Sequence, residues 1–322
     1  METTNQHTNG AAGPVIRVAD ACFPRFQAPD LGRMQAFLEA FGMQTAARTD
    51  TALYMRGTDG DPHVHATHLG EPAFLGLAFK ASSRTDLERL AAATGSAIET
   101  LDEPGGGEAV RLRDPDGRMV DVVFGIEAVP AIPVRTHPPL NSGERRERVG
   151  TLQRVGQGPA QVKRFGHSAI KTTRLREVSE WYRRTLGLLV SDDIYMEGPE
   201  QPIGSFLRCD RGSDPADHHT LLLLEAPEAK LGHCAWEVAD FDDLMVGREH
   251  LLMNDNGGHP YWGIGRHILG GQIFDYWKDP FGFTVEHWTD SDLLRADAPA
   301  GSHHIMNALN QWGPMPPPDL DF

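Results

Sequence analysis

The chain has 322 residues, 40% hydrophobic and 23% charged, which is the composition of a globular protein of about two domains. Its 45 acidic and 30 basic residues give a formal net charge of −15, which argues against nucleic acid and anionic membranes as partners. Three cysteines, no signal-peptide pattern and no apolar run of ~18 residues predict a cytoplasmic protein without a membrane segment.

The chain divides into five predicted segments. Residues 1–14 are polar and lack periodicity, which is typical of a disordered tail. Residues 129–160 are rich in Pro, Gly and charged residues, which indicates a linker between two domains. The linker separates an N-terminal module (residues 15–128) from a C-terminal module (residues 161–290). Residues 291–322 form a C-terminal tail.

The tail has an apolar content that is unusual for a free terminus, with Ile305, Met306, Leu309 and Trp312 before a Pro-rich end. This pattern favours a segment folded over the mouth of the C-terminal module as a lid. Docking for stability or contact between subunits is the alternative.

The two modules resemble each other. In each, a helical pattern precedes a glycine, Gly42 or Gly187, that is expected to end the helix. Each module also has a D-P-x-G turn that enters a strand, in "DPDGRMVDVVF" and in "DPFGFTVEHW". The order in each module is strand, helix, then several strands, twice over. Alignment of the modules sets Cys22 opposite His167, Gly76 opposite His233, and Asp121 opposite Glu286.

Glu286 lies in the apolar stretch "FTVEHW", where a buried carboxylate is costly unless it meets a cation. With His167 and His233 at equivalent strand positions, it completes the two-histidine, one-carboxylate set of non-haem Fe(II) sites, which leaves metal positions open. Each of the three residues taken alone could instead be an ordinary polar group at a strand end.

A second histidine-rich stretch, "HVHATH", contains His63, His65 and His68. Alternation along a strand would put His63 and His65 on one face and His68 on the other, so we interpret the stretch as the surface of a strand. By the same reasoning, His287 is expected to face outward, away from the site of Glu286.

Residues 15–290 resemble a type I extradiol ring-cleaving dioxygenase of the vicinal oxygen chelate superfamily. The motifs that carry the resemblance are "RFGHSAI", "DHHTLLLL", "KLGHCAWEV", "GRH" at 265–267 and "DYWKDPFGFTVEHW". The resemblance implies an α+β fold of two tandem modules of paired βαβββ units, with the metal site in the curved sheet of the C-terminal module. It also implies a homo-oligomer.

The resemblance further implies the roles of six residues. His167, His233 and Glu286 would bind the metal. His219 would be the acid/base above the ring, and His267 and Tyr276 would hydrogen-bond the substrate oxygens and the oxygenated intermediate. His218 is expected on the opposite strand face from His219, because successive strand residues face opposite sides.

The predicted activity is that of an Fe(II)-dependent, alternatively Mn(II)-dependent, dioxygenase that uses O2 to open a catechol-type ring beside its two hydroxyls. One alternative is a glyoxalase-like, metal-dependent isomerase or epimerase on the same fold. Another is a binding or resistance protein without turnover. The sequence leaves open which catechol is the substrate. Trp262 could line the pocket, and Arg266 could face a substrate carboxylate or hold a loop.

Overall fold

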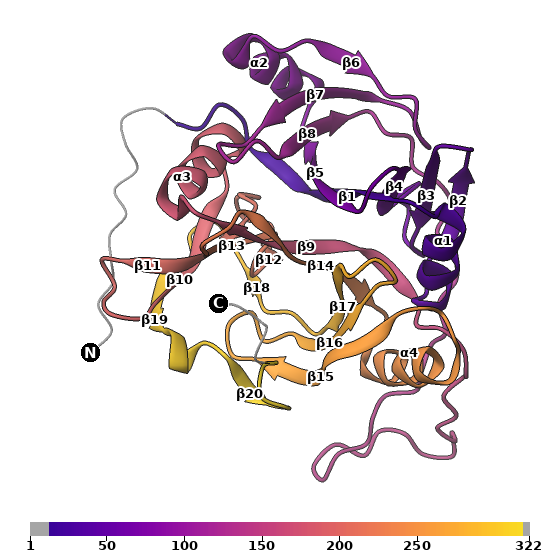
Figure 1. Ribbon diagram of the computed structural model, residues 1–322. Coiled ribbons are helices and arrows are strands. Elements are labelled where there is room, and N and C mark those ends of the chain that lie inside the picture. The colour runs from indigo at the N-terminus through magenta and orange to yellow at the C-terminus, as the bar shows by residue number, and fades with distance from the viewer. Residues whose placement is uncertain (1–12, 318–322) are drawn as a thin grey trace.

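The computed structural model describes residues 13–317, so the predicted disordered tail lies almost wholly outside the described residues. Figure 1 shows the two modules one above the other, each built on a curved sheet. The N-terminal module contains β1 (Val18–Ala28), α1 (Leu31–Ala40), β2 (Gln44–Arg48), β3 (Ala52–Arg56), β4 (His65–Leu69), β5 (Ala73–Ala81), α2 (Arg84–Thr94), β6 (Ile98–Thr100), β7 (Glu108–Arg113) and β8 (Met119–Phe124).

The C-terminal module repeats this order. It contains β9 (Val162–Thr172), α3 (Leu175–Leu186), β10 (Leu189–Tyr195), β11 (Pro202–Arg208), β12 (Ala216–Asp217), β13 (Leu221–Glu225), β14 (Lys230–Val238), α4 (Phe241–Met253), β15 (His259–His267), β16 (Ile273–Lys278) and β17 (Thr284–Thr289). The tail adds β18 (Leu293–Leu294), β19 (Gly301–His304), a 3-10 turn (Ile305–Asn307) and β20 (Asn310–Trp312).

The strand orders confirm the predicted fold class. The N-terminal sheet runs β2-β3-β4-β1-β5-β8-β7-β6, and the C-terminal sheet runs β19-β10-β11-β13-β9-β14-β17-β16-β15-β20. In each sheet the first strands of two βαβββ units lie side by side, β1 beside β5 and β9 beside β14. The fold is therefore α+β, made of two tandem modules of paired βαβββ units.

Local signals explain where the repeated elements begin and end. Helix α1 begins after Asp30, whose side chain accepts the backbone N–H of Arg33, and α3 ends at the left-handed Gly187. Gly42 follows α1 with a φ of 108°, and a Cβ there would lie 2.1 Å from the carbonyl oxygen of Ala160. Only glycine allows that close approach, because any side chain would overlap the neighbouring backbone.

The two D-P-x-G turns have the same geometry. In the first, Oδ1 of Asp114 accepts the backbone N–H groups of Asp116 (3.0 Å) and Arg118 (2.9 Å). In the second, Oδ1 of Asp279 accepts those of Phe281 (2.8 Å) and Phe283 (2.9 Å). Each turn thus directs the chain into the strand that follows, β8 or β17.

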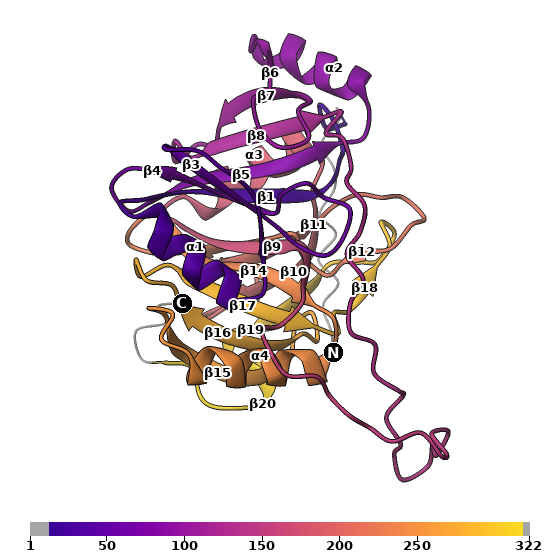
Figure 2. The same ribbon diagram turned by 90° about the vertical axis from the view of Figure 1, so that its right-hand side faces the viewer.

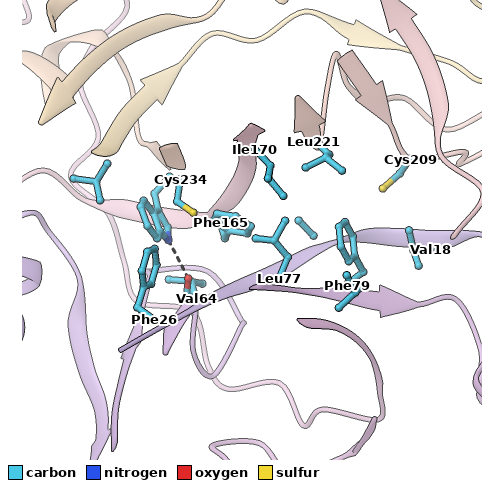
Figure 3. Packing of buried hydrophobic residues seen from close by; sticks show 14 of the residues in the cluster. Val18, Phe26, Val64, Leu77, Phe79, Phe165, Ile170, Cys209, Leu221 and Cys234 are labelled. Carbon is cyan, nitrogen blue, oxygen red and sulfur yellow. Dashed lines mark hydrogen bonds between the residues drawn. The ribbon is translucent and has the colours of Figure 1, made fainter. Parts of the chain in front are cut away.

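The two modules share one hydrophobic core, which lies between their sheets (Figure 3). Phe26 and Phe79 enter it from the N-terminal module, and Phe165 and Trp236 enter it from the C-terminal module. The indole N–H of Trp236 donates to the carbonyl of Val64 across the boundary at 3.0 Å. The modules therefore pack against each other through buried apolar side chains.

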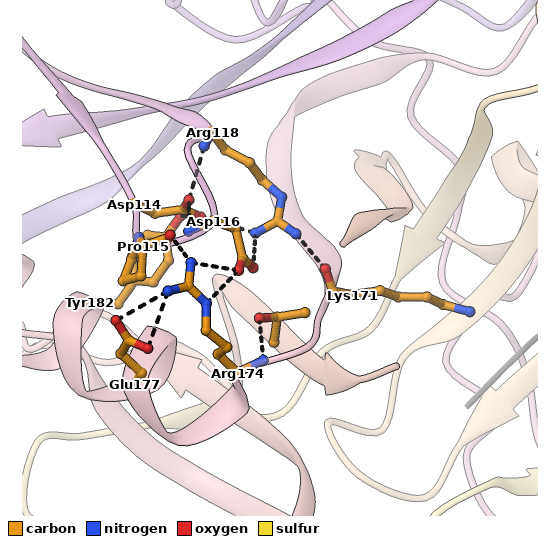
Figure 4. A network of polar contacts seen from close by, with 9 residues as sticks. Asp114, Pro115, Asp116, Arg118, Lys171, Arg174, Glu177 and Tyr182 are labelled. Carbon is orange, nitrogen blue, oxygen red and sulfur yellow. Dashed lines mark hydrogen bonds and ion pairs between the residues drawn. The ribbon is translucent and has the colours of Figure 1, made fainter. Parts of the chain in front are cut away.

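Charged side chains join the modules at the edge of this core (Figure 4). Nη1 of Arg118 lies 2.9 Å from Asp116, and Nη2 donates to the carbonyl of Lys171 in β9. Arg174, just before α3, returns the contact with Nη2 3.2 Å from Asp116. The first D-P-x-G turn is thereby attached to the start of the C-terminal module.

The predicted linker has no helix or strand between β8 and β9, and in Figure 2 it projects away from the body of the protein. The contacts that hold it at the start of α4 include Arg135, 2.6 Å from Asp243, and His137, 2.8 Å from Asp240. Among residues 13–317, no helix has the length and apolar character needed to cross a bilayer.

The prediction that "HVHATH" forms a strand surface was wrong. His63 and His65 are buried, and His63 precedes β4, so strand alternation does not relate the two side chains. His63 packs on Phe23 inside the N-terminal sheet, with its Nε2 3.5 Å from Glu103. His65 stacks on Phe26 in the shared core. The two side chains therefore lie in different parts of the module.

His287 is buried as well, so its predicted outward orientation was also wrong. Its ring stacks on Phe41 with a centroid distance of 3.6 Å, and its Nε2 lies 2.7 Å from the carbonyl oxygen of Phe41. It does point away from Glu286, but into the contact between the modules.

A test of this core uses the pH dependence of stability. Burial lowers the pKa of His65 to about 3, whereas an unfolded histidine titrates near ~6.5. The unfolded state therefore binds a proton below pH ~6.5 that the folded state excludes, so stability is full above that pH and falls as the pH falls towards 3. We expect His65→Gln to reduce the loss of unfolding free energy between pH 7 and pH 5 by about 2 kcal/mol.

Urea titrations at the two pH values measure this difference. The matched control is His259→Gln, a change at an exposed histidine. An equal loss of stability in the parent protein and in His65→Gln would contradict the buried, neutral state of His65.

Candidate metal centre and substrate cavity

Three adjacent central strands bring His167, His233 and Glu286 together. They lie on β9, β14 and β17, which are neighbours in the C-terminal sheet. Nε2 of His233 is 3.2 Å from Oε2 of Glu286, Nε2 of His167 is 3.4 Å from the same oxygen, and the two Nε2 atoms are 3.3 Å apart. One potential ligand atom of each residue thus points at a common centre.

The electrostatics of this group suit a cation. Burial lowers the pKa of His167 and of His233 to about 3, so both imidazoles are neutral, as metal ligation requires. Burial raises the pKa of Glu286 above its ordinary value. Among residues 13–317 no well-aligned hydrogen bond reaches either carboxylate oxygen of Glu286, although the Tyr276 hydroxyl lies close enough to lower the pKa of this carboxyl. A divalent ion would supply the missing partner, and this donor set fits one.

A cavity of about 290 Å³ opens beside the three residues. His219, His267 and Tyr276 line it together with His167 and His233. Apolar side chains and three lysines complete the lining. The remaining lining includes Ile194, Phe206, Leu222, Leu224, Leu269, Ile305, Leu309, Lys171, Lys230 and Lys278.

His267 and Tyr276 form a hydrogen-bonded pair in this cavity. Nε2 of His267 lies 3.2 Å from Oη of Tyr276 on the neighbouring strand. Burial lowers the pKa of His267 to about 4. Burial is the larger cause and the negative charge of Glu286 the smaller cause that raise the pKa of Tyr276 well above its ordinary value. A neutral imidazole and a protonated phenol therefore face the cavity.

His219 lies against the first histidine of the cluster, with its ring centroid 4.2 Å from that of His167. The expectation that His218 sits on the opposite strand face was wrong, since both residues lie in the loop between β12 and β13. Nδ1 of His218 is 3.2 Å from Nδ1 of His219. The two histidines are therefore coupled, although only His219 lines the cavity.

Trp262 and Arg266, whose roles the sequence leaves open, have different surroundings. Trp262 lines the cavity and donates its indole N–H to the carbonyl of Pro314 at 3.1 Å. Arg266 instead binds the carbonyl of Gly271 (2.6 Å) and the carboxylate of Asp290 (2.6 Å). Arg266 thus holds a loop.

Sequence reasoning missed most of the lining residues. In "LLLLE", strand alternation would have identified the leucines that face the cavity, Leu222 and Leu224, against the core-facing Leu221 and Leu223. The three lysines come from β9, β14 and β16, and no local signal connects them.

The N-terminal module holds a different group at the equivalent place. Asp121 pairs with Nε of Arg25 at 2.8 Å, and Nη1 of Arg25 reaches Glu103 at 2.7 Å. The strand ladders set Phe23 opposite Ala78, as they set His167 opposite Ala235. The counterpart of His167 is therefore Phe23 rather than Cys22, because an irregularity in β1 between Ala21 and Phe23 shifts the alignment by one residue.

Comparisons with known proteins agree with this architecture. No family model matches the chain. The chain is 30% identical to metapyrocatechase 2 of Cupriavidus necator over 302 residues, which cover 90% of this chain and 88% of that protein.

Two solved structures have a similar fold. An extradiol ring-cleaving dioxygenase from B. fuscum superposes with a TM-score of 0.78 at 17% identity, covering 99% of this chain and 84% of that one. The Mn(II)-bound glyoxalase from Novosphingobium aromaticivorans gives 0.76 at 23% identity, with 94% of each chain covered.

The fold is common to both of these enzymes and so does not separate them, whereas the identity to metapyrocatechase 2 extends over nearly the whole of both chains. The chain belongs to the extradiol ring-cleaving dioxygenases of the vicinal oxygen chelate superfamily.

Proposed function

We propose that this enzyme uses Fe(II), held by His167, His233 and Glu286, to open a catechol-type ring with O2 beside its two hydroxyls. The observation that carries the proposal is the cluster of two neutral imidazoles and one unpartnered carboxylate at the wall of a cavity that His219, His267 and Tyr276 also line. Mn(II) is the alternative metal, since a solved structure of similar fold is a Mn(II)-bound glyoxalase.

Held by His167, His233 and Glu286, the ion would supply Lewis-acid activation of the catechol oxygens and the redox chemistry that activates O2. Burial keeps the pKa of His219 well below its ordinary value, so the free imidazole is neutral and can accept a proton from a catechol hydroxyl. His219 then returns the proton to oxygen as the ring opens. His267 and Tyr276 hydrogen-bond the substrate oxygens, and the apolar wall excludes water.

The two alternatives predict different use of oxygen. A glyoxalase-like isomerase needs a metal and a base but no O2, and a binding protein needs neither turnover nor O2. Three further polar groups beside the ligand cluster support the dioxygenase, because protonation and hydrogen bonding of reduced oxygen require donors there. Oxygen uptake on addition of a panel of catechols separates the three functions, and only the dioxygenase consumes about one O2 per ring opened.

The metal ligands can be tested by metal content. We expect His167→Ala, His233→Ala and Glu286→Ala each to lose bound Fe(II) or Mn(II) and turnover, because each change removes one of three protein ligands. Mass spectrometry of the purified proteins measures bound metal. Asp121→Asn is the matched control: it changes the equivalent carboxylate of the N-terminal module, which pairs with Arg25 rather than with histidines. Full metal occupancy in His233→Ala, or metal loss in Asp121→Asn, contradicts the assignment.

The role of His219 is tested separately from metal binding. We expect His219→Phe to fold, keep its metal and bind a catechol, and to turn over roughly 10²–10⁴-fold more slowly because the positioned acid/base is lost. Rapid-mixing absorbance of the ring-opened product measures the rate. His250→Phe, on helix α4 and outside the cavity lining, is the control. Parent-like turnover in His219→Phe would remove this residue from the mechanism.

We further propose that the tail closes the cavity as a lid. Ile305 and Leu309 line the cavity, while β19 and β20 attach the tail to the two edges of the sheet. We expect Leu309→Ala to raise KM for a catechol by opening the apolar wall, with metal content unchanged. The neighbouring exposed change Met306→Ala should leave KM as in the parent. An unchanged KM in Leu309→Ala would exclude the lid role of this side chain.

We also propose three properties that no contact in the structure tests. They are the limits of the modules at residues 15–128 and 161–290, the cytoplasmic location, and the homo-oligomer. Light scattering of the purified protein measures the third.

A further inference from the structure

We propose that Asp192 and His218 are positioning residues that fix the tautomer and orientation of His219, and that the C-terminal tail completes this arrangement through His303. The inference rests on the proposed function in one respect only, namely that His219 exchanges a proton with the substrate.

A continuous chain of polar contacts leads from the cavity towards the surface. Nδ1 of His219 lies 3.2 Å from Nδ1 of His218, and Nε2 of His218 lies 2.6 Å from Oδ2 of Asp192. The other oxygen of Asp192 lies 2.8 Å from Nε2 of His303. The exposed fraction of the side chains rises along this series of contacts, from 5% for His218 through 14% for Asp192 to 36% for His303.

Hydrogen-bond chemistry assigns a direction to these contacts. An ionised carboxylate only accepts, so Nε2 of His218 must carry the proton that it shares with Asp192. A neutral His218 then has a bare Nδ1, which can only accept, so the neighbouring Nδ1 of His219 must be the donor. Neutral His219 is left with an unprotonated Nε2, which is the form that accepts a proton from a bound catechol. A serine-histidine-aspartate triad uses a carboxylate in the same way to hold a histidine in one tautomer.

The surrounding structure holds His218 from both sides. Its backbone N–H donates to the carbonyl of Asp292 at 2.9 Å, and its own carbonyl accepts the hydroxyl of Ser191 at 2.5 Å. A second hydrogen bond to that hydroxyl comes from Nη1 of the buried Arg208 at 3.0 Å. The loop between β12 and β13 therefore has little freedom to move His218 away from Asp192.

The tail is shaped to complete the arrangement. Strand β19 pairs with β10 in parallel and sets Gly301 beside Asp192. A Cβ at Gly301 would lie 2.0 Å from Oδ1 of Asp192 and 2.6 Å from Nε2 of His303. Glycine at this position leaves the space in which the carboxylate meets the second imidazole.

The first test combines kinetics with metal content. In Asp192→Asn, the amide oxygen and nitrogen can present either a donor or an acceptor to His218, so the tautomer of His219 is no longer fixed. We expect kcat to fall roughly 10–100-fold, as for other groups that orient a functional histidine, while KM for a catechol and bound metal stay as in the parent. Asp192→Glu, which keeps the carboxylate, should recover part of the loss.

Two adjacent residues provide matched controls. Asp193→Asn changes the next carboxylate on β10, which accepts the hydroxyl of Ser205 and does not line the cavity. His304→Gln changes the neighbour of His303, whose side chain accepts the backbone N–H of Met306. Both should keep the parent kcat, whereas His303→Gln should lower it less than Asp192→Asn does.

The second test reads the tautomer directly and needs no turnover. In the full chain loaded with diamagnetic Zn(II) and labelled with ¹⁵N-histidine, we expect the His219 signals to show a protonated Nδ1 and a bare Nε2. Asp192→Asn should reduce that preference. A protonated Nε2 in the parent, or a parent-like kcat in a fully metallated Asp192→Asn, overturns the proposal.

Failure of the proposed function can be distinguished from failure of the positioning role. If the parent protein consumes no O2 with any catechol, the function is wrong, while the tautomer measurement still decides the positioning role. If the parent turns over catechols and the Asp192 variants match it, only the positioning role fails.

Discussion

A carboxylate that is fully buried needs a cation beside it to remain charged, and Glu286 imposes this requirement on the C-terminal module. Two histidines lie 3.2 and 3.4 Å from its Oε2, and burial keeps both neutral, so they supply lone pairs and no charge. Among residues 13–317 no well-aligned hydrogen bond reaches its oxygens. A metal ion meets all of these conditions at once, and the central strands of the sheet are arranged so that it can.

In the N-terminal module, an arginine side chain supplies the cation that a buried carboxylate needs. Asp121, the counterpart of Glu286, has the Arg25 guanidinium beside it, and Glu103 binds the other end of that guanidinium. Phe23 fills the place of the first histidine. The same fold therefore contains one carboxylate that is neutralised by a neighbouring arginine and one for which a bound ion is the proposed partner. This difference is why we place the proposed metal site in the C-terminal module.

Signals that are local in the sequence predicted their structures well. Gly42, Gly187 and the two D-P-x-G turns each act over a few residues, so the repeated modules and the ligand cluster could be aligned from them. Features that depend on contacts between residues far apart in the sequence were not predicted correctly. An irregularity in β1 moved the counterpart of His167 by one residue, and the loop conformation of His218 and His219 made strand alternation irrelevant. His63 and His65 are buried because aromatic side chains from other strands cover them, which no pattern within "HVHATH" encodes.

The position of the tail strands has a consequence for biosynthesis. Strands β19 and β20 are separated by only a few residues, yet they lie at opposite edges of the ten-stranded sheet. Without them, the longer strands β10 and β15 would form the edges and present their unpaired backbone groups to other chains. Strands β19 and β20 follow all the other strands of this sheet in the chain, so a nascent chain whose central strands are already paired leaves β10 and β15 uncovered until these two strands emerge. Until then other chains could pair with the exposed strand edges, so we expect the tail strands to limit aggregation of the newly made protein, in addition to bordering the cavity.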